Sequence, residues 1–183
     1  MLQLITPEYQ KLNEDFHVEC STYGAGANKW AENIVNIIKT ANVRTVLDYG
    51  CGKGVLRPLV KEIVQSYINY DICVPEFSER PKGVFDLVLC LDVMEHVEPM
   101  FTDNVLCDIF DYTGKLALFN IATKPSVKNL PDGRNTHINL RSEREWLVML
   151  QKYFNFINVN LVNGTSYSAI NYFGSTIKVS SGV

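Results

Sequence analysis

One acid and three glycines stand where an apolar run of the sequence gives way to a helical pattern. The stretch VLDYGCGKG at 46–54 places Asp48 before Gly50, Gly52 and Gly54. Glycine at such a turn lets a ligand approach the backbone closely. In an open α/β sheet this turn lies at the carboxyl ends of the strands, where ligands bind. The stretch therefore predicts a ligand site.

A phosphate group is the weaker candidate for that ligand. The phosphate-loop pattern is absent because Lys53 is followed by glycine and valine, and the spacing G-x-G-x-G also differs from the dinucleotide pattern G-x-G-x-x-G. Asp48 would repel phosphate and attract an ammonium group. Asp71, at the end of the next predicted strand, can accept both hydroxyls of a ribose. An amino acid joined to a nucleoside satisfies both requirements.

A second set of residues could handle protons or bind a metal ion. Asp92, Glu95 and His96 follow a buried strand at i, i+3 and i+4, so they share one face if the segment is helical, and His137 lies in the long loop after the next strand. Three interpretations stay open: a general base, His96 or His137, oriented by Glu95; a divalent ion held by all four; or plain helix capping and packing. We assign His96, His137 and Glu95 to catalysis and no residue to a metal.

Strand and helix patterns alternate along the chain. Spacing and capping predict helices at 28–39, 55–64, 102–110 and 142–154, and short apolar runs predict strands at 44–49, 67–71, 85–92 and 115–122. Two further strands flank an Asn163-Gly164 turn signal. This alternation predicts an α/β fold with a mostly parallel sheet and an antiparallel C-terminal hairpin.

The connection between two of these strands is unusually short. Thirteen residues separate Asp71 from Phe85. A crossover helix with a further strand and helix would need more than about twenty, since one crossover alone takes at least about ten. The region between the second and fourth strands of such a fold is therefore shortened. The loop itself would then bind an adenine base, with Glu76 or Ser78 as candidates.

Composition favours one cytoplasmic domain spanning residues 1–183. The apolar content of 46% suffices for a single core, and five cysteines without C-x-x-C spacing favour reduced thiols. The net charge of -3 argues against a surface that mainly neutralises nucleic-acid phosphates. There is no signal-like N-terminus and no apolar run of about eighteen residues, so we expect no membrane association.

Several of these features together resemble the motifs of a known family. The acid-and-glycine run, the strand-end acid and FDLVLCLDVMEHV resemble class I S-adenosylmethionine-dependent methyltransferases over roughly residues 23–154. YGAGANKW, LPDGRNTH and EREW further resemble short bacterial and phage methyltransferases of unassigned substrate. The resemblance implies a Rossmann-like sheet and S-adenosyl-L-methionine as cofactor.

The resemblance also implies roles for residues around the glycine turn. The turn would line the methionyl group, Asp71 would bind the ribose hydroxyls, and the segment at Leu91 would border the cofactor. From the residues themselves we expect residues 1–27 to form a lid over the cofactor, with Lys29 pairing with its carboxylate. The expected cofactor-binding residues are Tyr23, Lys29, Asp48, Gly50, Cys51, Gly52, Gly54, Asp71, Ile72, Leu91 and Asp92.

The acceptor is predicted less directly. No N-P-P-[YFW] motif follows the strand at 85–92, which favours a small-molecule acceptor methylated at oxygen or nitrogen over a DNA base. An anionic acceptor fits the basic residues Lys124, Lys128, Arg134, Arg141 and Arg144. Two alternatives remain: a metal-assisted RNA 2′-O-methyltransferase and a non-catalytic S-adenosylmethionine-binding module. The metal-binding role resembles ubiquinone-pathway O-methyltransferases and small-RNA 3′-terminal 2′-O-methyltransferases, with Asp92 in place of the usual Glu.

Overall fold

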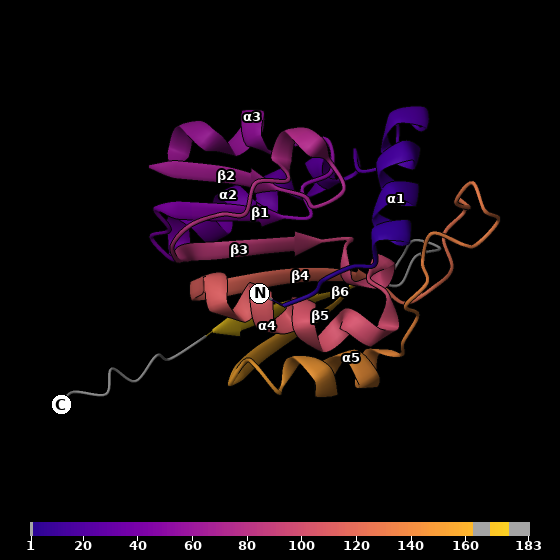
Figure 1. Ribbon diagram of the computed structural model, residues 1–183. Coiled ribbons are helices and arrows are strands. Elements are labelled where there is room, and N and C mark those ends of the chain that lie inside the picture. The colour runs from indigo at the N-terminus through magenta and orange to yellow at the C-terminus, as the bar shows by residue number, and fades with distance from the viewer. Residues whose placement is uncertain (1, 163–168, 176–183) are drawn as a thin grey trace.

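A six-stranded sheet with the order β2-β1-β3-β4-β6-β5 forms the centre of the protein (Figure 1). The computed structural model describes residues 2–162 and 169–175. The strands are β1 (Thr45–Tyr49), β2 (Ser66–Tyr70), β3 (Phe85–Leu91), β4 (Thr113–Ala122), β5 (Phe156–Val162) and β6 (Ala169–Ser175). The first four are parallel, whereas β6 runs antiparallel to both β4 and β5. The Asn163-Gly164 turn lies outside the described residues.

Helices cover both faces of this sheet. α4 (Thr102–Tyr112) and α5 (Glu143–Leu150) share one hydrophobic core with β1, β3 and β4. α2 (Ala31–Thr40) and α3 (Arg57–Val60) pack on the other face against the opposite side chains of the same strands. Strands buried on both faces read as continuous apolar runs, which is why β3 is recognisable in the sequence as FDLVLCL.

Three helices are shorter than the sequence predicts. The one expected at 28–39 is α2, which follows a 3₁₀ turn ending at Trp30. The helix expected at 55–64 is α3 followed by the 3₁₀ turn η2 (Lys61–Ile63), a segment in which β-branched residues disfavour regular helix. α5 begins as predicted, with Ser142 and Glu145 forming a capping box. It ends at Leu150 rather than 154, and in the turn that follows, Lys152 and Tyr153 donate to carbonyls three positions back, Met149 and Leu150.

The shortened connection places β2 at the edge of the sheet. β1 pairs with β2 on one side and directly with β3 on the other. Between β2 and β3 the chain forms only the 3₁₀ turn η3 (Pro75–Phe77). The predicted trimming is confirmed.

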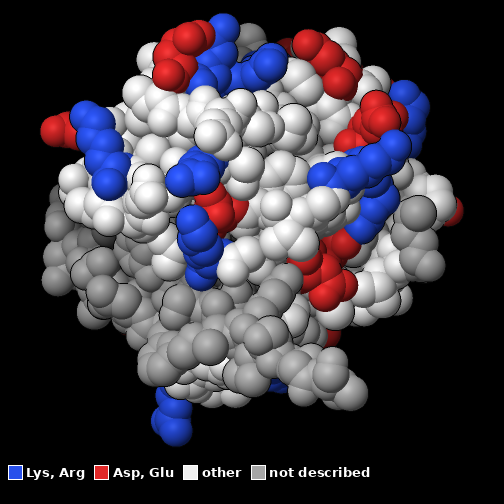
Figure 2. All heavy atoms as spheres, turned by 90° about the vertical axis from the view of Figure 1, so that its left-hand side faces the viewer, with Lys and Arg blue, Asp and Glu red and all other residues white. Residues whose placement is uncertain are grey.

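The N-terminal helix lies at the carboxyl ends of the strands. α1 (Pro7–Glu19) stands beside the ends of β2 and β3, with the loop 123–141 on its other side (Figure 1). The remaining 3₁₀ turns are η1 (Ala27–Trp30), η4 (Met94–His96) and η5 (Pro99–Phe101). On the opposite side of the molecule, acidic and basic side chains are interspersed over the described residues (Figure 2). None of the described helices is long and apolar enough to cross a membrane.

Candidate functional site

A cavity of about 130 Å³ lies between α1 and the carboxyl ends of β1, β2 and β3. The sheet side contributes Tyr49, Gly50, Gly52, Tyr70, Asp71, Ile72, Cys73, Asp92, Val93 and His96. The N-terminal segment contributes Leu4, Ile5, Tyr9, Asn13, His17, Tyr23 and Gly24. Val97, Glu98 and Val105 complete the lining. The glycine turn, the strand-end acid and His96 thus share one space that the N-terminal segment covers.

The glycine turn is tightly packed backbone. Gly50 and Gly52 have φ values of 74° and 53°, in the left-handed region that favours glycine. A Cβ on Gly50 would overlap Val93, and one on Gly52 would overlap the carbonyl of Gly24. That carbonyl accepts the Lys53 backbone N–H at 2.9 Å. The turn therefore offers a ligand bare backbone and cannot carry side chains at these positions.

Gly54 and Cys51 belong to the same turn but lie outside the cavity lining. A Cβ on Gly54 would meet Asn69 and Phe77, so this glycine accommodates β2 and the following loop. The Cys51 side chain is buried, and burial raises its thiol pKa. Both residues pack the side of the turn that faces the protein interior.

Asp71 faces the cavity with its carboxylate held by backbone. Oδ2 accepts the Gly52 N–H at 2.9 Å, and Oδ1 accepts the Cys73 N–H at the same distance. Each carboxylate oxygen can accept more than one hydrogen bond, so both remain able to bind hydroxyl groups. Ile72 and Cys73 continue this wall, whereas Glu76 and Ser78 lie outside the lining.

Asp48 points away from the cavity. It is 3% exposed, and its Oδ2 accepts the Tyr67 hydroxyl at 2.9 Å. Burial raises the pKa of this carboxyl to about 7. The Asp48 side chain thus lies between β1 and β2. Leu91 is also buried in the core and does not line the cavity.

Asp92 sits at the cavity in a strained conformation. Its φ is 57°, which is uncommon for a residue other than glycine. Its backbone N–H donates to the Asn120 carbonyl at 2.8 Å, and the Asn120 side-chain amide donates to its Oδ1. Its Oδ2 pairs with the Lys29 ammonium at 3.0 Å. Lys29 is thus brought to the site, and Asn120 is a supporting residue that no sequence motif indicated.

His96 lies in η4, which is a single 3₁₀ turn rather than the helix considered for this segment. Its Nδ1 is 2.8 Å from the Thr136 carbonyl, so this nitrogen carries the proton and donates. The Tyr23 hydroxyl lies 3.4 Å from the same nitrogen, and the Tyr9 hydroxyl donates to the His96 carbonyl. Burial and the neighbouring His137 lower the pKa of His96 to about 3. The ring is neutral at pH 7, with an Nε2 lone pair to offer.

Glu95, His96 and His137 lie together in the structure. The two imidazoles form an edge contact with centroids 4.9 Å apart, and His137 Nδ1 donates to the Lys124 carbonyl at 2.6 Å. Glu95 Oε1 accepts the Ala122 N–H, whereas its buried Oε2 has no partner among the described residues. Burial, followed by the charge of Asp92, raises the pKa of Glu95. One ligand atom from each of Glu95, His96 and His137 falls within 4.8 Å of the others.

The sequence predicted a lid over residues 1–27, but it did not identify α1 or the side chains that this helix presents to the cavity. Tyr9, Asn13 and His17 all line the cavity. Their spacing of four residues puts them on one face of a helix, and this regularity is the signal that could have revealed them. Asn13 is 4% exposed and accepts the Tyr23 hydroxyl at 3.0 Å, so it links the helix to the segment that follows.

Comparisons with known proteins agree with this geometry. A family model described as a methyltransferase domain matches residues 25–160. No curated protein matches the sequence. The structure is similar to 1,6-didemethyltoxoflavin-N1-methyltransferase of Burkholderia thailandensis, with a TM-score of 0.64 and 17% identity, covering 96% of this chain and 92% of that one.

Two further solved structures share the fold. For an S-adenosylmethionine-dependent methyltransferase from Clostridium acetobutylicum the TM-score is 0.63 at 12% identity, with 81% of this chain and 91% of that chain covered. For the methyltransferase domain of bacterial CtHen1-CN the TM-score is 0.59 at 17% identity, with coverages of 79% and 96%. Identities this low establish the common fold alone.

Proposed function

We propose, from the premise that this chain belongs to the class I S-adenosylmethionine-dependent methyltransferase family, that it methylates an oxygen or nitrogen atom of a small-molecule acceptor. The observation that carries the proposal is the shared cavity: the glycine turn, Asp71 and His96 line one space beneath α1. A covered space of this kind admits a small molecule more readily than a polymer. In this proposal residues 1–183 act as one methyltransferase domain, with residues 1–27 as its lid.

The residues present fit S-adenosyl-L-methionine. When bound, this cofactor supplies an electrophilic methyl group on a sulfonium sulfur. Gly50 and Gly52 leave room for the methionyl chain against bare backbone, and Asp71 accepts ribose hydroxyls. The base attached to that ribose would extend along Ile72 toward Tyr49 and Tyr70. The ring centroids of these two tyrosines are 5.1 Å apart. The Tyr70 hydroxyl there is buried and has no partner among the described residues.

The pair of Lys29 and Asp92 suits the charged end of the cofactor. An amino acid carries an ammonium and a carboxylate on neighbouring atoms, and this ion pair presents the two complementary charges side by side. Lys29 would bind the carboxylate and Asp92 the ammonium. Asn120 keeps the Asp92 carboxylate in place.

His96 is the proposed proton acceptor. It lines the cavity, and its Nδ1 proton is engaged with the Thr136 carbonyl, which leaves Nε2 to face an acceptor. His137 packs edge-on against it, with ring centroids 4.9 Å apart. Burial and the neighbouring His137 lower the pKa of His96, so its Nε2 is unprotonated at pH 7 and can accept a proton.

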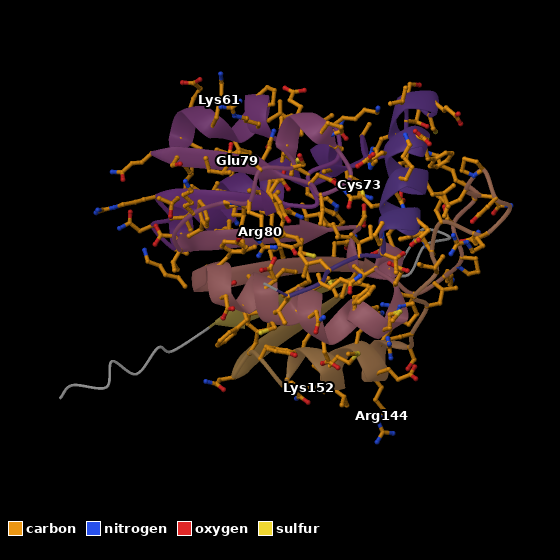
Figure 3. The ribbon with its side chains drawn as sticks, in the orientation of Figure 1. Lys61, Cys73, Glu79, Arg80, Arg144 and Lys152 are labelled. Atoms are coloured by element: carbon orange, nitrogen blue, oxygen red, sulfur yellow. The ribbon has the colours of Figure 1, made fainter. Side chains whose placement is uncertain are left out.

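An anionic acceptor would meet Arg134. Its guanidinium lies 5.2 Å from the centre of the Tyr9 ring, which lines the cavity. Arg141 instead stacks on Trp146. Figure 3 shows Arg144 on α5, away from α1 and Cys73. Of the basic residues that the sequence grouped together, Arg134 is the one we expect to affect acceptor binding.

Two experiments test the proposal in sequence. Calorimetric titration with S-adenosylhomocysteine should show one binding site, and no binding by the intact protein would contradict it. Incubation with methyl-labelled S-adenosylmethionine and fractionated host extract should then label a small-molecule fraction, both with and without chelator. Once an acceptor is found, Arg134→Ala should raise its KM and leave cofactor affinity unchanged.

A second candidate function is metal-assisted transfer to a hydroxyl group, as in 2′-O-methylation of RNA. The observation that favours it is the cluster of Glu95, His96 and His137. Both imidazoles donate Nδ1–H to backbone carbonyls, Thr136 and Lys124, which leaves both Nε2 lone pairs free, and Glu95 Oε2 is unpartnered among the described residues. Histidine ligands of metals are commonly fixed in this manner. The ion would lower the pKa of the acceptor hydroxyl.

Thermal unfolding with Mn²⁺ separates the two candidates without an acceptor. If the cluster binds the ion, Mn²⁺ should raise the melting temperature of the wild type and leave that of Glu95→Gln unchanged. Glu76→Gln, at an exposed acid outside the cavity lining, is the matched control and should respond like the wild type. Label entering RNA and vanishing with chelator would refute the small-molecule proposal and support this candidate.

A further inference from the structure

We infer that His17 of α1 is a further cofactor-binding residue, which donates a hydrogen bond to the ribose of the adenosyl group beside Asp71. This inference rests on the proposed function, because it requires an adenosyl cofactor in the cavity. None of the motifs in the sequence indicated His17, and the proton transfer proposed for His96 and His137 does not use it.

The position of His17 follows from the glycine turn. The point where a side chain on Gly24 would begin lies 2.7 Å from His17 Cε1 and 2.9 Å from the Cα of Gly52. The imidazole therefore lies against the turn at Gly52. The N–H of Gly52 in turn donates to Asp71 at 2.9 Å. His17 and Asp71 thus flank the same part of the cavity, and both line it.

Several contacts hold His17 in this place. Its carbonyl accepts the Lys53 ammonium at 2.8 Å, while the Lys53 backbone N–H donates to Gly24. The ring packs on Tyr23 with centroids 4.6 Å apart. A side chain fixed on both its backbone and its ring is already oriented before a ligand arrives, which reduces the entropy lost on binding.

The hydrogen bonds of the His17 ring indicate which of its nitrogens faces the cavity. Burial lowers the pKa of His17, so the imidazole is neutral and carries one N–H. Nδ1 is buried and has no partner among the described residues. A buried N–H without an acceptor is disfavoured, so the proton belongs on Nε2. Since Nδ1 is sealed, the ring edge that reaches the cavity is the one that carries Nε2.

A ribose hydroxyl completes this arrangement. A hydroxyl both donates and accepts, and so can donate to the Asp71 carboxylate while accepting from His17 Nε2–H. The negative charge of Asp71 also favours a donor beside it, and the Lys53 ammonium is the other charged group that acts on the ring. The pair would recognise the diol from two sides.

Calorimetry with two ligands tests the inference. S-adenosylhomocysteine and 5′-methylthioadenosine share the adenosyl group, but only the first has the amino acid. His17→Phe should weaken both by the same factor, about 3- to 10-fold, as expected for one hydrogen bond. His17→Gln, which keeps an N–H donor, should lose less. Val18→Ala, at a neighbouring residue that is 84% exposed, is the control and should bind like the wild type.

The outcomes are distinct. Unchanged affinity of His17→Phe for both ligands, or a loss confined to S-adenosylhomocysteine, would overturn the ribose assignment. For either the 2′-deoxy or the 3′-deoxy form of methylthioadenosine, His17→Phe and the wild type should bind equally well. If His17→Phe binds both deoxy forms more weakly than the wild type does, the ribose assignment is wrong. Thermal unfolding checks that each variant is folded, and His17→Leu, which also lacks a donor, replaces His17→Phe in the comparison if His17→Phe does not fold. Failure of the wild type to bind S-adenosylhomocysteine would instead refute the proposed function.

Discussion

Replacing Asp48 by asparagine should stabilise the protein at pH 8 and leave cofactor affinity unchanged. Asp48 is the acid of the glycine-rich signature, where an ammonium-binding role is one expectation. The structure instead buries its carboxylate against the Tyr67 hydroxyl. An asparagine side chain would keep an oxygen for that hydroxyl and would carry no charge. The Asp48→Asn variant therefore tests whether the charge of Asp48 affects folding stability or cofactor binding.

The magnitude follows from the raised pKa of Asp48. An unfolded Asp ionises near 3.8, whereas the buried carboxyl keeps its proton up to about pH 7. The folded state therefore loses stability relative to the unfolded chain as the pH rises between these values, and the loss is complete above about 7. A shift of about three units at 1.36 kcal/mol per unit gives at most about 4 kcal/mol. Asparagine does not ionise, so the variant avoids this loss at pH 8.

Urea unfolding of wild type and variant at pH 4 and pH 8 measures the effect. The difference between the two proteins cancels the contributions of other buried groups, including Glu95 and His96. The variant should gain stability at pH 8 and little or none at pH 4. Titration with S-adenosylhomocysteine at pH 8 supplies the second measurement.

Either of two results would refute this reasoning. A variant less stable than wild type at pH 8 would mean that the carboxylate is ionised and favourably solvated in the fold. A loss of cofactor affinity of more than about tenfold in a folded variant, or about 1.4 kcal/mol, would mean that the charge of Asp48 acts on the ligand.

Three further predictions concern the cavity itself. Gly52→Ala should abolish S-adenosylhomocysteine binding, because its Cβ would displace the carbonyl of Gly24, while Gly26→Ala, with nothing within 4 Å, should bind normally in the same titration. Asp71→Ala should weaken that binding by about 1–3 kcal/mol through lost hydrogen bonds to a charged acceptor, and unchanged affinity would exclude the ribose role. With an identified acceptor, His96→Gln should lower kcat by about 10²- to 10⁴-fold, and an unaltered kcat would exclude it as the base.

The sequence by itself determined the sheet and its ligand turn. β3 is a nearly continuous apolar run, β1, β2 and β4 are short stretches rich in aliphatic and aromatic residues, and the capping box of α5 is a pattern of four adjacent residues. The left-handed conformation of Gly50 and Gly52 is likewise a local requirement that only glycine meets easily. Such features depend on neighbours in the chain, so residue types and spacing are enough to predict them.

Only the tertiary structure decided which of these residues face the cavity. Asp48 stands in the signature, yet its side chain lies between strands, because the alternation along β1 and the position of Tyr67 on β2 decide its direction. The meeting of His96 with His137 depends on a loop held by backbone carbonyls. α1 reaches the cavity because Thr6 and Tyr9 bond to the segment after β3. These contacts join residues far apart in the chain, and no local spacing encodes them.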